Sequence, residues 1–222
     1  MLIRPRRFAA IFLASLLTLP PCSLAFETPL SDTAVRDAYF LGQHHDSIYG
    51  GFLQKYGVSL PLPKTGPQIA SVSFFTPYAL TAIHSNQNAG SYSAQQAQID
   101  HDKRPEFVQV VVQIWFTSSY GPYIIQPTNS RPDSVKGFVL RSPDFWRDFR
   151  VRVLQKDHLV IPLSAVGEPI LNCGDESGCD LSGATLTFEY PATAFTADTA
   201  TVVVAPPEGD PVSVDFDLTS FR

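Results

Sequence analysis

The 222-residue sequence has little of what marks specialised classes of protein. It contains three cysteines and one methionine, 17% of its residues are charged, and its formal net charge is −5. These values exclude a disulfide-dense miniprotein and a strongly charged disordered chain. The sequence also lacks a Gly-x-Ser-x-Gly elbow, a His-Glu-x-x-His pair and a glycine-rich phosphate loop. The composition therefore describes an ordinary globular chain and identifies no activity.

Residues 1–25 have the layout of a secretory signal peptide. Three arginines precede an apolar run over residues 8–19, and small residues follow at Ser23 and Ala25. This run is shorter than the roughly 20 residues that a membrane-spanning helix needs. We therefore expect cleavage near Ala25 and a mature protein that is secreted or periplasmic. Twin-arginine export and lipid attachment at Cys22 stay open as alternatives.

The charge that remains after cleavage argues against some partners. Without its three leader arginines the chain has 13 basic and 21 acidic residues, which is a net charge of about −8. Binding to nucleic acid needs a clustered basic surface, so we expect no nucleic-acid partner. No later apolar run reaches membrane-spanning length, so we also expect no membrane span.

Two cysteines remain in the mature chain, Cys173 and Cys179, with five residues between them. In an oxidising compartment such a pair predicts a local disulfide that closes a hairpin loop. A redox or metal-binding thiol pair is the alternative, although redox sites usually have the tighter Cys-x-x-Cys spacing.

Residues 26–67 predict a helical N-terminal segment followed by a proline-rich linker. Ser31 or Asp32 can cap a first helix that carries an apolar stripe, and a second short helical turn is expected over 48–56. Prolines at 61, 63 and 67 then exclude a regular helix. Beyond this segment, the stretch Ser93–Ile99 is the only further helix that we predict.

From residue 69 onward the hydrophobic period changes to two, which indicates strands. The clearest strand is 106–117, where Val108, Val110, Val112, Ile114 and Phe116 share one face and Trp115 lies on the other. In the strand expected over 145–155, Phe145, Phe149, Val151 and Val153 point inward and Trp146 outward. Shorter strands are expected around 159–163 and 185–190, with Leu159, Ile161 and Leu163 on one side of the first, and a closing hairpin over 201–205 and 212–218. This pattern predicts a mainly β fold: an antiparallel β-sandwich, Ig-like or jelly-roll-like, over residues 68–222.

The acid–base residues form no familiar ligand set, so we predict no metal and no cofactor. His44, His45 and Asp46 are interpreted as a polar helix end, and the Asp100–Asp102 stretch with His101 at its centre as a solvated loop. Asp215 and Asp217 lie on the same side of one expected strand. They can bind calcium or form cross-strand ion pairs with Arg150 and Arg152, or with Lys156, and we favour the ion pairs.

Four aromatic residues are the candidate binding residues: Trp115, Tyr120, Tyr123 and Trp146. Exposed rings beside polar residues suit sugar stacking or a protein interface. The alternative, which we favour as the explanation of their placement, is that the N-terminal helices cover these rings with Tyr39, Phe40 and Phe52.

The sequence thus favours a non-catalytic exported β-sandwich protein that binds an unidentified protein or glycan. An alternative is a secreted hydrolase with a convergent site, in which His101 or His84 works with a nearby carboxylate. A module stabilised by a metal ion at Asp215 and Asp217 is a third possibility.

Overall fold

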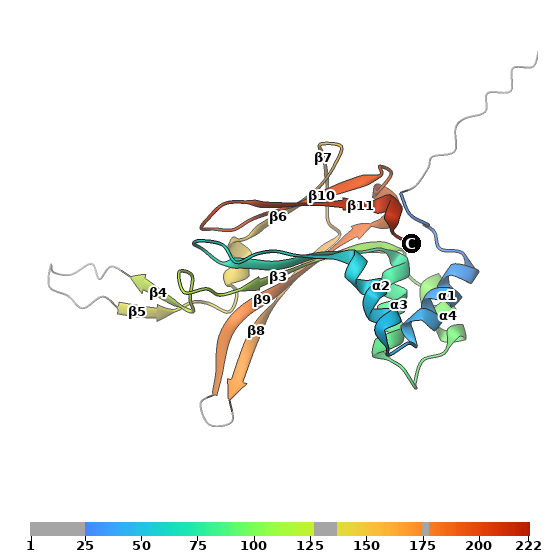
Figure 1. Ribbon diagram of the computed structural model, residues 1–222, viewed down its shortest axis with the longest axis horizontal. Helices are drawn as coiled ribbons and strands as arrows, with labels where there is room; N and C mark the ends of the chain where they lie inside the picture. The colour runs from blue at the N-terminus through green and yellow to red at the C-terminus, as the bar shows by residue number, and fades with distance from the viewer. Residues whose placement is uncertain (1–24, 127–136, 175–177) are drawn as a thin grey trace, which may run out of the picture.

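The computed structural model describes residues 25–126, 137–174 and 178–222, so residues 1–24 of the predicted leader, Cys22 among them, lie outside the described residues (Figure 1). The described chain is mainly β, and its sheets are antiparallel. Two larger sheets lie face to face, four α-helices gather at one end, and a small two-stranded sheet projects from the opposite end (Figure 1).

The larger of the two facing sheets has five strands, in the order β1–β2–β3–β9–β8. Their bounds are Gly57–Ser59 for β1, Gln68–Phe75 for β2, Phe107–Trp115 for β3, Gly178–Pro191 for β9 and Ser164–Gly174 for β8. The alternation predicted for β3 is confirmed, because Val108, Val110, Val112 and Ile114 are fully buried. Phe116 follows the end of β3.

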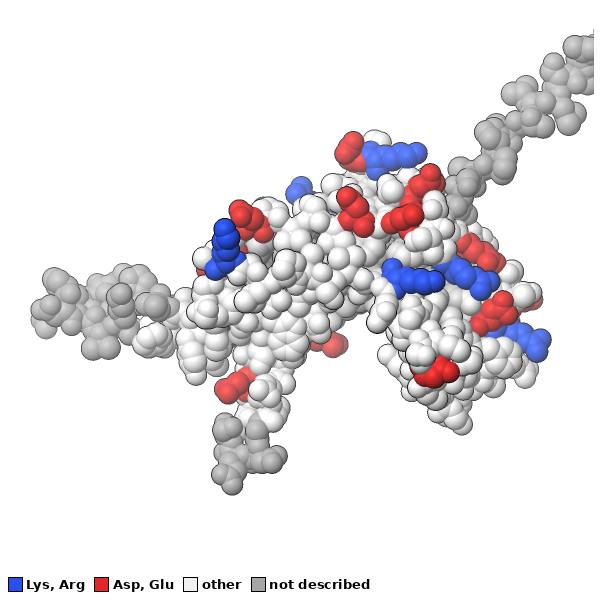
Figure 2. Space-filling view, in the orientation of Figure 1, with Lys and Arg blue, Asp and Glu red and all other residues white. Residues whose placement is uncertain are grey.

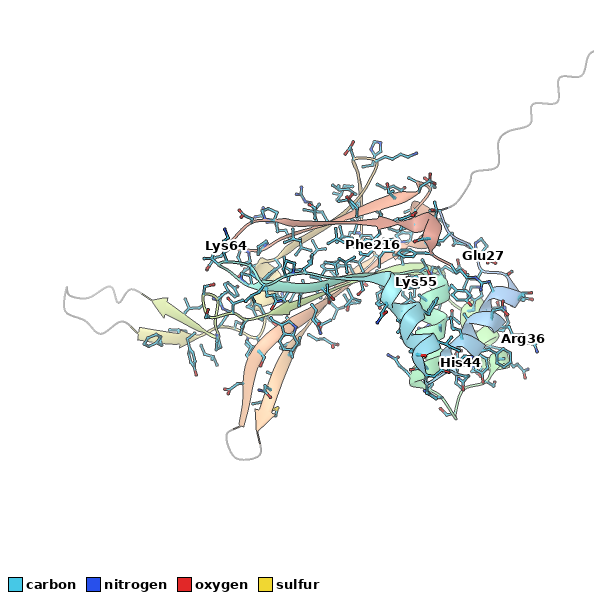
Figure 3. All side chains as sticks on the ribbon, in the orientation of Figure 1. Glu27, Arg36, His44, Lys55, Lys64 and Phe216 are labelled. Atoms are coloured by element: carbon cyan, nitrogen blue, oxygen red, sulfur yellow. A yellow bond between two sulfur atoms is a disulfide. The ribbon has the colours of Figure 1, made fainter. Side chains whose placement is uncertain are left out.

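The second sheet has four strands, in the order β11–β10–β6–β7. Their bounds are Val212–Asp217 for β11, Thr199–Ala205 for β10, Arg150–Gln155 for β6 and His158–Val160 for β7. The predicted closing hairpin is confirmed as β10 and β11. Phe216 points from β11 into the space between the sheets, where its ring centroid lies 5.5 Å from that of Phe74 on β2 (Figure 3). The two sheets therefore share one apolar core.

The four α-helices form a lobe with its own small core. The helices are α1 (Asp32–Gly42), α2 (Ser47–Leu53), α3 (Pro77–Gln87) and α4 (Ala94–Asp102). Ser31 caps α1 as predicted, since its side chain accepts a hydrogen bond from the backbone N–H of Ala34. Val35 and Ala38 of α1 pack with Ala82 of α3 and Ala97 of α4. The expected second helical turn is α2 followed by the 3-10 helix η1 (Gln54–Tyr56).

The helix α3 was not predicted, because the period-two hydrophobicity after residue 69 indicated strands almost throughout. Thr76 caps this helix and Pro77 occupies its first turn, which are ordinary signals of a helix start. Both signals directly follow the strand β2, so they were not recognised as a helix start. The helix is stabilised by burying Tyr78, Ala79 and Ala82. The predicted helix at 93–99 is confirmed as α4, but it continues to Asp102. His101 therefore lies in the last turn of a helix and not in a loop.

The stretch 145–155 also differs from its prediction. Phe145–Asp148 form a 3-10 helix, η2, and the strand β6 begins only at Arg150. Phe145, Phe149 and Val153 are buried as expected, but Trp146 belongs to η2 and not to the outward face of a strand. The remaining 3-10 helices are η3 (Ala192–Ala194) and η4 (Leu218–Ser220).

The segment that joins the two sheets was only partly predicted. β7 ends at Val160, and the chain then enters β8, a strand that we did not predict. Leu159, Ile161 and Leu163 were expected to share one side of a strand, yet all three are exposed. Only Leu159 belongs to a strand, the outermost strand β7, and Ile161 and Leu163 lie in the connection between β7 and β8.

The predicted disulfide is confirmed. Cys173 of β8 and Cys179 of β9 are direct cross-strand partners and their sulfur atoms are bonded. The bond ties the two strands together near the far end of the long β8–β9 hairpin (Figure 1).

Candidate functional site

The two tryptophans lie on opposite faces of the five-stranded sheet. Trp115 ends β3 and follows the buried Ile114, so it belongs to the outer face. Trp146 packs against Gly167 of β8, where an added Cβ would lie 2.2 Å from the indole ring. Gly167 pairs with the buried Leu186, so this contact is on the inner face. The tryptophans therefore cannot form one binding surface.

The two tyrosines differ just as much in their surroundings. Tyr120 is buried among Phe116, Phe145 and Phe149, and the Arg141 guanidinium lies 3.7 Å from its ring centroid. Burial raises the pKa of Tyr120. Tyr120 thus offers no exposed ring, contrary to expectation. Tyr123 is 59% exposed, but it stands on the projecting strand β4 (Tyr123–Gln126).

The N-terminal helices do not cover these four rings, although we favoured that explanation. Phe52 packs on Tyr56 and Tyr78, with ring centroids 5.0 and 5.9 Å away. Tyr39 packs on its neighbour Phe40 and on Tyr92. These aromatic residues belong to the helical lobe and to its junction with the core.

The outer face of the five-stranded sheet is the surface on which Trp115 lies. β2, β3, β8 and β9 contain no lysine and no arginine. Across β3, β9 and β8 the strand register aligns the outward residues in rows, and two of these rows are polar, with Val111, Thr187 and Val166 between them. The polar rows are Gln113, Thr185 and Glu168 in one, and Gln109, Glu189 and Ser164 in the other. In Figure 2 the hollow between the β8–β9 hairpin and the helical lobe is mostly free of charged side chains.

A cleft of about 560 Å³ opens at the helical end of this outer face. α3 and α4 form its walls, and Phe107 and Gln109 of β3 contribute to its lining. Gln109 and Phe107 have the same outward orientation on β3 as Trp115, since they are separated by even numbers of residues. The cleft and the outer face are therefore one continuous surface.

Within this cleft the structure brings together two residues that are five positions apart. The His101 Nε2 atom lies 3.5 Å from the Glu106 Oε1 atom, and their side chains are 16% and 10% exposed. Glu106 also accepts hydrogen bonds from the Thr28 hydroxyl and, at 2.6 Å, from the Leu30 backbone N–H. The N-terminal segment thus holds the carboxylate that faces the imidazole. We predicted a partner for His101, but nothing in the local sequence singled out Glu106.

A second polar group lies in the same cleft. The ring of His84 meets the ring of Tyr92 edge to face, with centroids 4.7 Å apart. Burial, reinforced by the nearby Asp100 carboxylate, raises the pKa of Tyr92 to about 12. The Tyr92 hydroxyl therefore keeps its proton at neutral pH and can donate a hydrogen bond. Tyr92 was not predicted, because it is 14 residues away from Glu106 in a turn between two helices.

The other histidines lie elsewhere. His44 and His45 follow α1, and Asp46 caps α2 by accepting a hydrogen bond from the Ile48 backbone N–H. The interpretation of this cluster as a polar helix end is thus confirmed, and Figure 3 shows His44 in the helical lobe. His158 is an exposed residue of β7.

The carboxylates of Asp215 and Asp217 are each engaged by a neighbouring hydroxyl. Asp215 accepts a hydrogen bond of 2.6 Å from Thr201, its cross-strand partner. Asp217 caps η4 by accepting from the backbone N–H and the hydroxyl of Thr219. The ion pairs expected with Arg150 and Arg152 are not formed, because the register places Thr201 beside Asp215. In the part of the chain that the structure describes, no three His, Cys, Asp or Glu residues are grouped to hold a metal ion.

Fold and site together define a mainly β protein with antiparallel sheets, a helical lobe and one cleft at their junction. Over residues 25–126, 137–174 and 178–222, each helix is too short or too polar to cross a bilayer. A scan against models of protein families finds no match to this chain, and neither does a search of curated protein sequences.

Proposed function

We propose that this is an exported, non-catalytic binding protein whose ligand is a neutral glycan. Its two facing sheets form a β-sandwich of Ig-like or jelly-roll-like type, and the ligand lies along the outer face of the five-stranded sheet. One observation carries this proposal: the partly exposed Trp115 stands at one end of the outward side of β3, Gln113 and Gln109 follow along it, and the cleft opens at the other end.

The chemistry of the row suits sugar hydroxyls. A tryptophan ring offers a flat apolar surface for the C–H face of a sugar ring. Gln109 and Gln113 each supply an amide that both donates and accepts, as hydroxyl groups do. Along β3 the row from Gln109 to Trp115 is about 20 Å long. The strands β2, β3, β8 and β9 contribute no lysine or arginine to this surface, and its cationic side chains, Lys103 and Arg104, lie in the cleft at the far end from Trp115.

Export is part of the same proposal. The arginine-rich, apolar N-terminus is typical of a signal peptide, and the disulfide is typical of an oxidising compartment. The chain that follows the expected cleavage point is anchored from its first residue: Phe26 is buried, and its ring lies 6.4 Å from Phe195. The intact mass of the exported protein tests this part, because cleavage near Ala25 leaves Phe26 as the N-terminal residue.

Binding is tested with the mature protein and a panel of soluble neutral oligosaccharides, namely cello-, xylo-, malto- and chito-oligosaccharides. We expect calorimetry to detect binding of at least one series. Trp115→Ala should weaken that binding about tenfold or more, which is ~1.4 kcal/mol. Tyr123→Ala is the matched control, because Tyr123 is an exposed aromatic residue outside the outer face. Equal losses in the two variants, or no binding of any series, would contradict the proposal.

A hydrolase is the second candidate, favoured by the contact between His101 and Glu106 in the cleft. Glu106 can orient the imidazole, and His101 can then take a proton from an attacking water molecule. Chromogenic ester and glycoside substrates test this candidate. A hydrolase loses its activity with His101→Asn and keeps it with the exposed control His158→Asn, whereas a non-catalytic protein shows no activity in any form.

A further inference from the structure

A groove of about 420 Å³ lies beside β7. One wall is the β6–β7 hairpin, and the other is the segment 191–196, which begins at the last residue of β9. The groove shares no lining residue with the cleft. Its volume is that of a small-molecule site, which is about 300–1,000 Å³. It is therefore a separate candidate site for a small ligand.

Most of the groove is aliphatic. Leu159, Val160 and Ile161 line one wall, and Pro191 and Ala194 line the other. Leu159 is 52% exposed and Ile161 66%. The lining contains no phenylalanine, tyrosine or tryptophan ring on which a sugar or a base could stack. An alkyl chain that covers these side chains gains free energy with each methylene group that leaves water.

One lining residue is a buried amide with an unpaired donor. Gln155 is 8% exposed, and its Oε1 atom accepts a hydrogen bond of 3.1 Å from the Thr196 backbone N–H. This bond fixes the amide, because a flipped amide would turn its NH2 group toward the same N–H. The Nε2 atom has no hydrogen-bond partner among the described residues. A buried donor without a partner is costly, so an acceptor oxygen of a ligand is favoured here.

Two further donors flank this amide. His158 is the cross-strand partner of Gln155, and Lys156 lies in the turn between them. Both line the groove, whereas Asp157 of the same turn does not. Lys156 forms no ion pair with a described residue, Asp215 and Asp217 included. The lining thus has a positive charge and contains no carboxylate.

We propose that this groove binds a free fatty acid of medium chain length. The carboxylate accepts a hydrogen bond from the Gln155 Nε2 group and lies beside Lys156 and His158, and the alkyl chain covers the aliphatic walls. A carboxylate fits better than a phosphate, because the groove supplies one lysine and neutral donors rather than several cations. A neutral apolar ligand would leave the Gln155 donor unpaired. Fatty-acid binding at this groove is additional to the proposed glycan binding and does not depend on it.

Charge makes the recognition of the carboxylate local. The mature chain has an expected net charge of about −8, so it repels an anion over most of its surface. Lys156 and His158 offset this repulsion at the groove. The aliphatic walls then supply most of the affinity, and the donors decide that the carboxylate lies at the β6–β7 turn.

Calorimetry of the mature protein with octanoate, 1-octanol and acetate tests the proposal. We expect one octanoate to bind per chain. Acetate should not bind, because it has no alkyl chain to cover the walls. Octanol should bind about fivefold more weakly or less, because it lacks the charge that strengthens the hydrogen bonds. No binding of octanoate, or equal affinity for octanoate and octanol, would contradict the proposal.

Three variants locate the ligand. Gln155→Glu keeps an acceptor for Thr196 and sets a second carboxylate against the ligand, so it should weaken octanoate binding about tenfold or more. A buried carboxylate can itself destabilise the fold, so two variants of exposed residues accompany it. Lys156→Glu and Ile161→Ser should each weaken binding about threefold or more. Circular dichroism of each variant shows whether it is folded.

Matched controls come from exposed residues outside the groove. Lys64→Glu reverses the charge of an exposed lysine in the loop before β2 (Figure 3). Leu140→Ser removes an aliphatic side chain that is 60% exposed on β5 (Gly137–Leu140). Both should bind octanoate like the wild-type protein. Equal losses in the controls, or unchanged binding in Lys156→Glu and Ile161→Ser, would overturn the proposal.

Vesicles separate a free fatty acid from a membrane surface as the ligand. We expect the mature protein not to sediment with phosphatidylcholine–phosphatidylglycerol vesicles. Sedimentation with these vesicles that is lost in Ile161→Ser would show that the groove binds a bilayer, and the proposal would be wrong.

Discussion

The inner and outer faces of the five-stranded sheet are made by the same strands and differ in almost every property. On β3 the inward residues Val108, Val110, Val112 and Ile114 are fully buried, whereas the outward residues between them are half-buried and include two glutamines and Trp115. The inner face stabilises the fold by removing apolar surface from water, about 1.5–3 kcal/mol for each large side chain. The outward residues of β3 stay partly exposed, so they remove less apolar surface from water, and this is the face on which we propose that the ligand binds. Stability and proposed function thus depend on alternate residues of one strand.

The largest expected effect is a loss of stability on the inner face only. Phe74 of β2 contacts Phe195, Phe216 and Phe221, so Phe74→Ala should lower the free energy of unfolding by about 3–5 kcal/mol. Gln113→Ala on the outer face should change it by about 0.5 kcal/mol or less. Urea unfolding of both variants measures the difference. Similar values for the two would show that the outer face is also part of the core.

A smaller effect is expected where Trp146 packs against the inner face of β8. Gly167→Ala places a Cβ within 2.2 Å of the indole ring, which should cost about 1–3 kcal/mol through overpacking. The matched control is Gly51→Ala in α2, where an added Cβ meets no atom within 4 Å. In a Trp146→Leu background the cost of Gly167→Ala should shrink, because a double-mutant cycle isolates the contact. An unchanged cost would place the strain elsewhere.

The third prediction concerns alkaline pH. Burial raises the pKa of the inner-face residue Tyr190 to about 12, compared with about 10 in an unfolded chain. The unfolded state therefore loses its proton first, and stability is complete below pH 10 and falls between about pH 10 and 12. Tyr190→Phe should reduce this fall. Thermal unfolding of the wild-type protein and the variant at a series of pH values measures this difference. If Tyr190→Phe changes stability by the same amount at pH 8 as between pH 10 and 12, the cause is a loss of packing and not the tyrosine proton.

The smallest expected effect on stability comes from replacing the outward tryptophan. Trp115→Phe should change the free energy of unfolding by about 0.5 kcal/mol or less. Each single tryptophan variant leaves one indole as a fluorescent reporter of one face. An oligosaccharide that binds the outer face should change the emission of Trp146→Phe, which retains Trp115, and leave that of Trp115→Phe unchanged. The opposite result would place the ligand between the sheets.

Several features could be predicted because their signals are local. The alternation in β3, the closing hairpin, the Ser31 cap and the Cys173–Cys179 bond each depend on residues close together in the chain. α3 was not predicted, because its cap Thr76 and its Pro77 directly follow the strand β2. The period-two pattern of that strand favoured a β prediction for the residues after it as well. Trp146 was misplaced for a related reason, because alternating apolar residues at 145, 149, 151 and 153 also fit a 3-10 turn that leads into a strand.

The candidate site could not be predicted as a whole, because its parts come from distant segments. Thr28, His84, His101 and Glu106 meet only when α3 and α4 fold back on the start of β3 and the N-terminal segment docks beside them. The sequence alone determined which residues alternate along each strand, since backbone pleating needs no partner. Strand order and register decided which faces those residues share, because hydrogen bonds between strands far apart in the chain bring Trp115, Thr185 and Glu168 onto one surface.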